Sequence, residues 1–281
     1  MLLKDFKIKF INQLSLIYDV EEVNSLFYIS LEQINKVKRI DLALNPNIVL
    51  TDDECVKWNK VLEELEIQKP IQYIFKNSHF YGLEFFVSPS VLIPRQETEE
   101  LVEWIIKDNT LNNPSIIDIG TGSGCIAISL AKNIKTAQVF AIDISIDALE
   151  IAKHNAAKNK VIVSFIETNI LTAKSLPLKY NVIVSNPPYV RNLEKHEIKP
   201  NVLEFEPHLA LFVEDTDALL FYRKIAELAK NHLEKNGKLY FEINQYLALE
   251  MQDLLINMGF VDVQLKKDIH NNNRMIVGTL K

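Results

Sequence analysis

Residues 116–124 read Ile-Ile-Asp-Ile-Gly-Thr-Gly-Ser-Gly, an apolar run that passes into a glycine-rich turn. The β-branched residues favour a strand, and three glycines in five positions allow a tight turn whose backbone can lie close to a ligand. The helix-like segment Ile126–Lys132 follows, and its first N–H groups can bind an anion. A strand, a glycine turn and a helix in this order are typical of an open α/β sheet that binds ligands at the carboxyl ends of its strands.

Strand-like and helix-like segments alternate around this stretch. Further strands are predicted at 139–142, 161–166, 182–184, 239–243 and 275–280. Further helices are predicted at 146–158, 218–232 and 247–258. This alternation predicts an α/β fold with a mostly parallel, Rossmann-like sheet and helices on both faces.

The N-terminal part has a different pattern. Residues 1–75 are helical in character, and Thr51–Glu54 has the sequence of a capping box that starts a helix. Apolar stripes at helical spacing predict a small helical domain; they are Phe6, Phe10, Leu14 and Ile17, then Cys55, Trp58, Val61, Leu62 and Leu65. Residues 76–96 are expected to form a hairpin connector, with paired strands over 79–93, and residues 97–281 the α/β domain.

Composition limits the function classes. The net charge of -6 argues against a long, non-specific grip on nucleic acid. The two cysteines, Cys55 and Cys125, form no C-x-x-C pair, so neither a disulfide framework nor a metal site is expected. No signal-peptide pattern and no membrane-length apolar run is present, and we expect a cytoplasmic protein with no membrane partner.

The glycine spacing distinguishes two cofactors. Asp143 ends the next predicted strand, where a carboxylate can bind both hydroxyls of a ribose. A dinucleotide motif, G-x-G-x-x-G, would place its third glycine at position 125, which is Cys125. The observed G-x-G-x-G, with Asp118 before it, resembles the S-adenosylmethionine motif of class I methyltransferases and leaves a nicotinamide cofactor as the weaker alternative. The expected cofactor-binding residues are Gly120, Thr121, Gly122, Ser123, Gly124, Asp143, Asn169, Ile170 and Asn186, of which Asn169 and Ile170 rest on the resemblance.

A second motif, Asn-Pro-Pro-Tyr at 186–189, follows the predicted strand at 182–184. Two consecutive prolines fix the backbone and remove two N–H donors, which leaves the Asn186 side-chain oxygen and the Pro187 carbonyl as a rigid pair of acceptors. Such a pair can hold both hydrogens of a planar –NH₂ group, with Tyr189 stacked on its flat face. Asn186, Pro187 and Tyr189 are the predicted catalytic residues, and Pro188 completes the predicted substrate site. A purely structural loop is the alternative.

Beyond these motifs the chain resembles the bacterial release-factor glutamine N5-methyltransferases over nearly its whole length. The further segments that carry the resemblance are 70–74, 92–99, 204–211 and 268–274. The resemblance implies methylation of the glutamine in the Gly-Gly-Gln loop of class I peptide chain release factors. The helical domain would help to grip this protein partner.

The chain departs from the family pattern at a few positions. Lys76, Asn77 and Asn244 stand where the family usually has glycine, and Ala218 replaces another. We expect these changes to alter loops without touching the chemistry.

Two other functions remain open from the sequence. An adenine N6-methyltransferase acting on DNA or RNA would use the same Asn-Pro-Pro-Tyr logic, but it needs a basic face, and no stable nucleic-acid binding is expected from an acidic chain. A non-catalytic S-adenosylmethionine-binding protein would have no need of a rigid acceptor pair.

Overall fold

The computed structural model describes all 281 residues, which divide into two compact units. The first comprises Met1–Lys76 with Pro200–Phe205, and the second comprises Asn77–Lys199 with Glu206–Lys281. Lys76, the last residue before the second unit, has φ 54°, in the left-handed region where glycine is the usual residue. None of the helices is both long and apolar enough to cross a membrane.

The first unit is built from helices only. They are α1 (Leu3–Leu14), α2 (Val20–Asn35), α3 (Arg39–Leu44), α4 (Asp52–Glu66), α5 (Ile71–Phe75) and α9 (Pro200–Phe205). The predicted capping box is confirmed, because the Glu54 N–H donates to Thr51 Oγ1 and the Thr51 N–H donates to the Glu54 carboxylate. Trp58 is fully buried and packs against three phenylalanine rings, Phe6, Phe10 and Phe27.

The prediction that Ile17 belongs to the apolar stripe of the first helix is wrong. Helix α1 ends at Leu14, so Ile17 lies in the turn that follows and is 39% exposed. The N–H groups of Ser15, Ile17 and Tyr18 already close this turn on Ile11 and Leu14. The spacing of Ile17 continues the helical period, but the helix itself does not.

The second unit contains a seven-stranded sheet, with the mostly parallel order that the sequence predicts. Its strands are β3 (Ser115–Ile119), β4 (Gln138–Asp143), β5 (Ser164–Glu167), β6 (Tyr180–Ser185), β9 (Leu233–Glu242), β10 (Val261–Lys267) and β11 (Asn273–Thr279). The order is β10-β11-β9-β6-β3-β4-β5, and β11 is antiparallel to both of its neighbours. Strand β10 was not predicted; it is an edge strand without a fully buried residue, so its apolar signal is weak.

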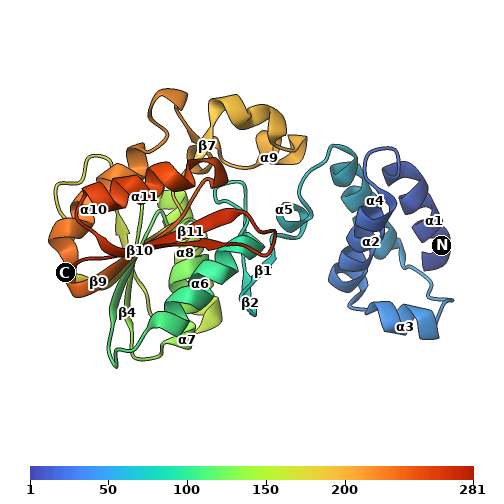
Figure 1. Cartoon of the computed structure of the whole chain (residues 1–281). Helices are drawn as coiled ribbons and strands as arrows, with labels where there is room; N and C mark the ends of the chain where they lie inside the picture. Colours follow the sequence, from blue (N-terminus) through green and yellow to red (C-terminus); the bar gives the residue numbers. More distant parts are fainter. The chain divides into compact units, whose positions relative to one another are not determined.

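Helices cover both faces of this sheet (Figure 1). One face carries α6 (Gln96–Asp108), α7 (Cys125–Asn133) and α8 (Ile146–Asn159), and the other carries α10 (Leu220–His232) and α11 (Ala248–Asn257). Successive strand residues supply the two cores: Ile116 and Val182 pack with α6 and α7, whereas Ile117 and Ile183 pack with α10 and α11. This alternation follows from the two-residue period of a strand and explains why the central strands are apolar throughout.

The predicted hairpin is present but shorter than expected. Strands β1 (Ser78–Phe80) and β2 (Leu83–Phe85) pair antiparallel, and residues 86–95 continue as irregular chain with no strand. Pro89 and Pro94 cannot donate to a strand ladder, which accounts for the early end. Asn155 of α8 fixes the start of this segment by bonding both backbone groups of Phe86.

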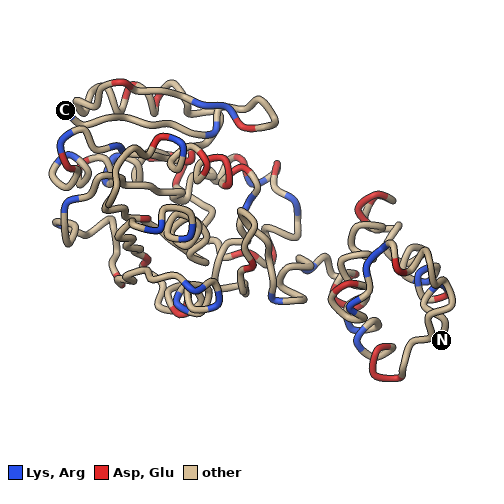
Figure 2. Tube along the Cα trace, turned by 90° about the horizontal axis from the view of Figure 1, so that it is seen from below, with Lys and Arg blue, Asp and Glu red and all other residues tan.

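The order of the strands reverses between β3 and its neighbour β6. The chain goes from β3 outward to β4 and β5, and then crosses to β6 on the other side. A crevice forms at such a switch point, above the carboxyl ends of the strands. A small parallel pair, β7 (Val190–Arg191) with β8 (Phe212–Val213), follows β6 in the same unit. Acidic and basic positions are scattered over both units (Figure 2).

Candidate functional site

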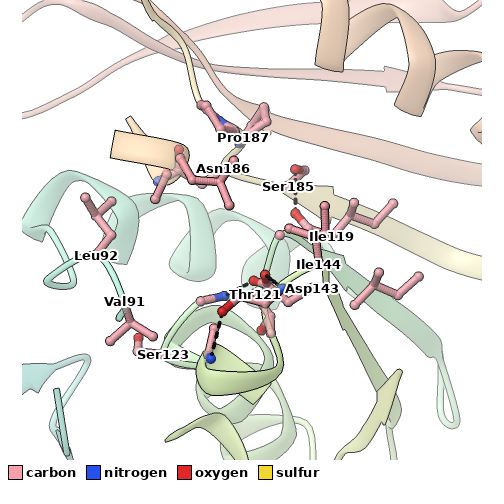
Figure 3. A pocket seen from close by; sticks show the side chains of 18 of the residues that line it. Val91, Leu92, Ile119, Thr121, Ser123, Asp143, Ile144, Ser185, Asn186 and Pro187 are labelled. Atoms are coloured by element: carbon pink, nitrogen blue, oxygen red, sulfur yellow. Dashed lines mark hydrogen bonds between the residues drawn. The ribbon is translucent and has the colours of Figure 1, made fainter. Parts of the chain in front are cut away.

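A cavity of about 510 Å³ lies at the carboxyl ends of β3, β4 and β6. Its volume is in the range of small-molecule sites. Of the twelve site residues that the sequence predicts, ten line it, and Gly124 and Tyr189 do not. Figure 3 shows Asn186 and Pro187 on one side of this cavity and Thr121, Ser123 and Asp143 on the other.

The glycine turn meets the cavity with bare backbone. Gly122 lines the cavity with φ 53°, and a Cβ built on it would meet no atom within 4 Å. Gly124 has a different role, because a Cβ there would lie 2.8 Å from Ile128 Cδ1 and 3.1 Å from Ala152 Cβ. The third glycine therefore allows α7 and α8 to pack, and the expectation that it contacts a ligand is not supported by its position.

Asp118 holds the glycine turn in place from within the protein core. Its side chain is completely buried, and Oδ2 accepts from the Thr121 hydroxyl at 2.6 Å and from the Ala127 N–H at 3.3 Å. Oδ1 has no partner. Burial raises the pKa of Asp118 to about 7, because the charged form is poorly solvated.

Asp143 ends β4 and faces the cavity (Figure 3). Its Oδ2 accepts from the Gly122 N–H at 2.8 Å, and its Oδ1 accepts from the Ser145 N–H at 2.9 Å. An ionised carboxylate has about four acceptor sites, so each oxygen can still accept a hydroxyl from a ligand. The carboxylate is thus held rigidly while keeping capacity for two hydroxyl donors.

Apolar residues form the walls between these polar groups. The sequence identified Ile170, and the structure adds side chains that it missed: Ile119, Ile142, Ile144, Leu171, Phe221 and Ile225. Ile144 is 46% exposed, which is unusual for an isoleucine. It directly follows Asp143, so the position of Asp143 in the sequence could have indicated that Ile144 also lines the site. An apolar slot beside a fixed carboxylate suits a ligand with a flat ring attached to a sugar.

Asn186 presents its side chain to the cavity in a defined direction. Its Nδ2 donates to Thr98 Oγ1 at 3.4 Å, and the Thr98 hydroxyl in turn donates to Glu242 Oε2 at 2.6 Å. Because Nδ2 is used in this way, Oδ1 is the group that a ligand in the cavity can meet. Thr98 also lines the cavity, although the sequence did not single it out as a site residue.

Tyr189 is held away from the cavity wall, so the structure does not support the predicted stacking of its ring. The hydroxyl donates to Glu242 Oε1 at 3.0 Å, and the backbone carbonyl accepts from Asn244 Nδ2 at 3.0 Å. Burial raises the pKa of the phenol. Asn244 was expected to leave the chemistry untouched, but this bond places it directly on the Asn-Pro-Pro-Tyr loop.

An ion pair joins two segments that border the cavity. Arg95 Nη2 lies 2.5 Å from Glu206 Oε1, and the Ile93 N–H donates to Glu206 Oε2 at 3.2 Å. Arg95 lines the cavity together with Pro207, the residue after Glu206. Both segments were recognised in the sequence, but only as parts of a resemblance, and neither residue was named as part of the site.

Known proteins are similar to this chain in sequence and in fold. Residues 97–204 match the Methyltransferase small domain family. A release factor glutamine methyltransferase from Flavobacterium psychrophilum is 56% identical over 280 residues, covering 98% of each chain. The protein of the same name from Bacteroides thetaiotaomicron is 43% identical over 92% of this chain and 94% of its own.

Solved structures confirm the class I methyltransferase fold. A methyltransferase from Pyrococcus furiosus aligns with a TM-score of 0.52 at 18% identity, covering 71% of this chain and 89% of its own. The hMettl16 catalytic domain aligns with a TM-score of 0.55 at 17% identity, covering 82% of each chain. At these identities the likeness concerns the fold alone, whereas the close sequence relatives decide the family. The chain belongs to the release factor glutamine methyltransferase family.

Proposed function

We propose that the protein transfers a methyl group from S-adenosylmethionine to the side-chain amide nitrogen, N5, of the glutamine in the Gly-Gly-Gln motif of class I peptide chain release factors. Membership of the family supports this substrate. The observation that carries the proposal is the Asn186 side chain, oriented with its oxygen available in a cavity that Asp143 also lines.

The cavity fits the cofactor in volume and in the polar groups that line it. Asp143 would accept the two ribose hydroxyls, and the bare backbone at Gly120 and Gly122 leaves room for the methionine part. Asn169 and Ile170 line the cavity beyond β5 and would border the adenine ring. When bound, S-adenosylmethionine supplies an electrophilic methyl group on a sulfonium.

The chain's own contribution is to position the amide. Asn186 Oδ1 and the Pro187 carbonyl would accept the two amide hydrogens, which directs the nitrogen toward the methyl group. Pro188 has no N–H, so no donor competes at this rim. An amide nitrogen is a weak nucleophile, and holding it in line lowers the barrier by up to roughly 7–11 kcal/mol in the best cases.

The acceptors also stabilise the charge that develops. As the nitrogen gains the methyl group, the bond between that methyl and the sulfonium sulfur would break and positive charge would accumulate on the nitrogen. One of its two protons would then leave to water. Acceptor oxygens aimed at that nitrogen favour the transition state over the bound substrate. Tyr189 would act here by holding the loop, since its ring lies off the cavity.

We assign the helical part, residues 1–75, to recognition of the protein substrate, with residues 76–96 as a connector and 97–281 as the catalytic domain. The first unit supports this because its core is complete without a contribution to the cavity. A small separate domain with its own core is well suited to extend the contact with a protein partner.

The test is incubation of the purified protein and S-adenosylmethionine with an intact class I release factor, followed by peptide mass spectrometry. We expect one added methyl on the glutamine of the Gly-Gly-Gln peptide and none when that glutamine is replaced by alanine. A parallel reaction on adenine-containing DNA and RNA should give no methyladenine. Methyladenine without methylglutamine would contradict the proposal.

A further inference from the structure

Glu242, at the end of β9, is 1% exposed and sits behind the cavity rather than in it. Both of its carboxylate oxygens are used: Oε2 accepts from Thr98 and Oε1 accepts from Tyr189. We propose that Glu242 is a positioning residue for methyl transfer, which sets the direction of the Asn186 amide through Thr98 and holds the Asn-Pro-Pro-Tyr loop through Tyr189. The inference rests on the proposed function and assigns it a residue outside the cavity lining.

The argument begins with the polarity of the hydrogen bonds. The Glu242 carboxylate accepts from both Thr98 and Tyr189, so the single hydroxyl proton of Thr98 is used in the bond to Glu242. The Thr98 oxygen can then only accept a hydrogen bond, and the donor that Asn186 offers it is the Nδ2 group of the side-chain amide. The Glu242 carboxylate, buried behind the cavity, therefore turns the Asn186 amide so that its oxygen Oδ1 faces the substrate.

The second contact fixes the loop itself. Tyr189 is held at both ends from the exit of β9, because its hydroxyl bonds Glu242 and its carbonyl bonds Asn244 two residues later. Asn244 is itself held by Glu194, which accepts from the same Nδ2 group at 2.9 Å. Residues at the end of β9 thus hold Tyr189, which follows the two prolines, at two points.

Glu242 is in turn rigidly placed. Its backbone carbonyl accepts from the Tyr222 hydroxyl at 3.1 Å, and the carbonyl of Ile243 accepts from Arg274 at 3.4 Å. Arg274 also pairs with the buried carboxylate of Asp268, across the β10–β11 hairpin. Burial raises the pKa of Glu242, and the hydrogen bond from Thr98 and the charge of Arg274 oppose that rise.

A purely structural role would be met more simply by an apolar residue, because an apolar side chain of similar size fills a core without the desolvation cost of a carboxylate.

The neighbouring Tyr240 provides a matched control. It lies on the same strand, is equally buried, and donates to Asp108, at the opposite end of α6 from Thr98. Tyr240→Phe removes a buried hydrogen bond from β9 and should leave methyl transfer unchanged.

The test compares single-turnover rates and S-adenosylmethionine affinities for Glu242→Gln, Thr98→Val and Thr98→Ser. Glutamine has one acceptor and one donor, so either Thr98 or Tyr189 loses its acceptor and the Asn186 amide is free to reverse. We expect Glu242→Gln and Thr98→Val each to slow transfer by roughly 10- to 100-fold, without a comparable loss of cofactor affinity. Thr98→Ser, which keeps the hydroxyl, should recover most of the rate that Thr98→Val loses.

Thr98 and Glu242 direct the Asn186 amide through the same chain of bonds, and in the double variant Glu242→Gln/Thr98→Val the glutamine oxygen stays available to accept from Tyr189. The double variant should therefore be no slower than the slower single variant. A wild-type rate in Glu242→Gln, losses that multiply in the double variant, or an equal loss in Thr98→Ser would overturn the inference. If Glu242→Gln does not fold, the pair of Thr98 variants still decides it.

A second readout does not depend on activity. The ¹H–¹⁵N signals of the Asn186 side-chain amide can be assigned by their disappearance in Asn186→Asp. They should shift and exchange faster with solvent in Glu242→Gln and Thr98→Val, but not in Thr98→Ser or Tyr240→Phe; unchanged signals in the first two would overturn the inference. A wild-type protein that methylates no release factor would instead refute the proposed function, and the amide signals would still decide the positioning role.

Discussion

Gly122 and Asp143 are joined by a 2.8 Å hydrogen bond from the backbone N–H of the first to the carboxylate Oδ2 of the second. The bond connects the turn after β3 to the end of β4, the strand that pairs with β3 on the side away from β6. The carboxylate proposed to bind the ribose therefore also holds the glycine turn in place. A change at Asp143 acts on both.

Asp143→Ala should weaken S-adenosylmethionine binding by roughly 1.5–3 kcal/mol, the range for hydrogen bonds to a charged group. Isothermal titration calorimetry gives the affinity directly. Glu150→Ala is a suitable control, because it removes a nearby negative charge from α8 that does not line the cavity. Equal affinities for Asp143→Ala and the wild type would remove Asp143 from the cofactor site.

Asn186→Ala should lower the rate of methyl transfer far more than the affinity for the cofactor. Loss of one positioned partner in a transition state costs roughly 3–4 kcal/mol, or two to three orders of magnitude in rate. Asn186→Asp keeps the shape and an acceptor and should be partly active. Single-turnover kinetics at saturating S-adenosylmethionine separate chemistry from binding, and a wild-type rate for Asn186→Ala would disprove the acceptor role.

Asp118 should make the stability of the protein depend on pH. Its folded pKa of about 7 lies above the ordinary value of 3.8, so the folded state holds a proton that the unfolded state has lost. The stabilising contribution is complete below about pH 4 and is lost as the pH rises to 7, a change on the order of 4 kcal/mol. Comparison of denaturant unfolding at several pH values with Asp118→Asn checks this, since the variant should lack that part of the dependence. Parallel curves for the two proteins would contradict the prediction.

Residues 77–281 alone should fold, bind S-adenosylmethionine and methylate the intact release factor poorly. The cut belongs before β1, because Phe80 and Phe85 of the hairpin are buried in the core of the second unit. The measurement is kcat/KM on the intact release factor and on a short Gly-Gly-Gln peptide. A truncated protein as active as the full chain on both substrates would show that the helices do not recognise the release factor.

Features that depend on a few neighbouring residues could be predicted from the sequence. The Thr51–Glu54 capping box acts within one helical turn, and the glycine turn at 120–124 and the Asn-Pro-Pro-Tyr motif have backbone requirements that only certain residues meet. The periodic apolar segments around them were enough for the mostly parallel sheet. The edge strand β10 and the end of α1 were missed because there the periodic pattern is weak or continues past the element.

The direction in which the site residues point was decided only by the tertiary structure. Thr98 and Glu242 are 144 residues apart, and Arg95 and Glu206 are 111 apart, so no local pattern relates them. Tyr189 shows the consequence: its motif predicts a ring over the substrate, but Glu242, the last residue of β9, and Asn244, just after that strand, hold it away from the cavity. The sequence by itself determined which side chains reach this end of the sheet. Their orientation depends on hydrogen bonds between distant segments, which exist only once the sheet has brought its strand ends together.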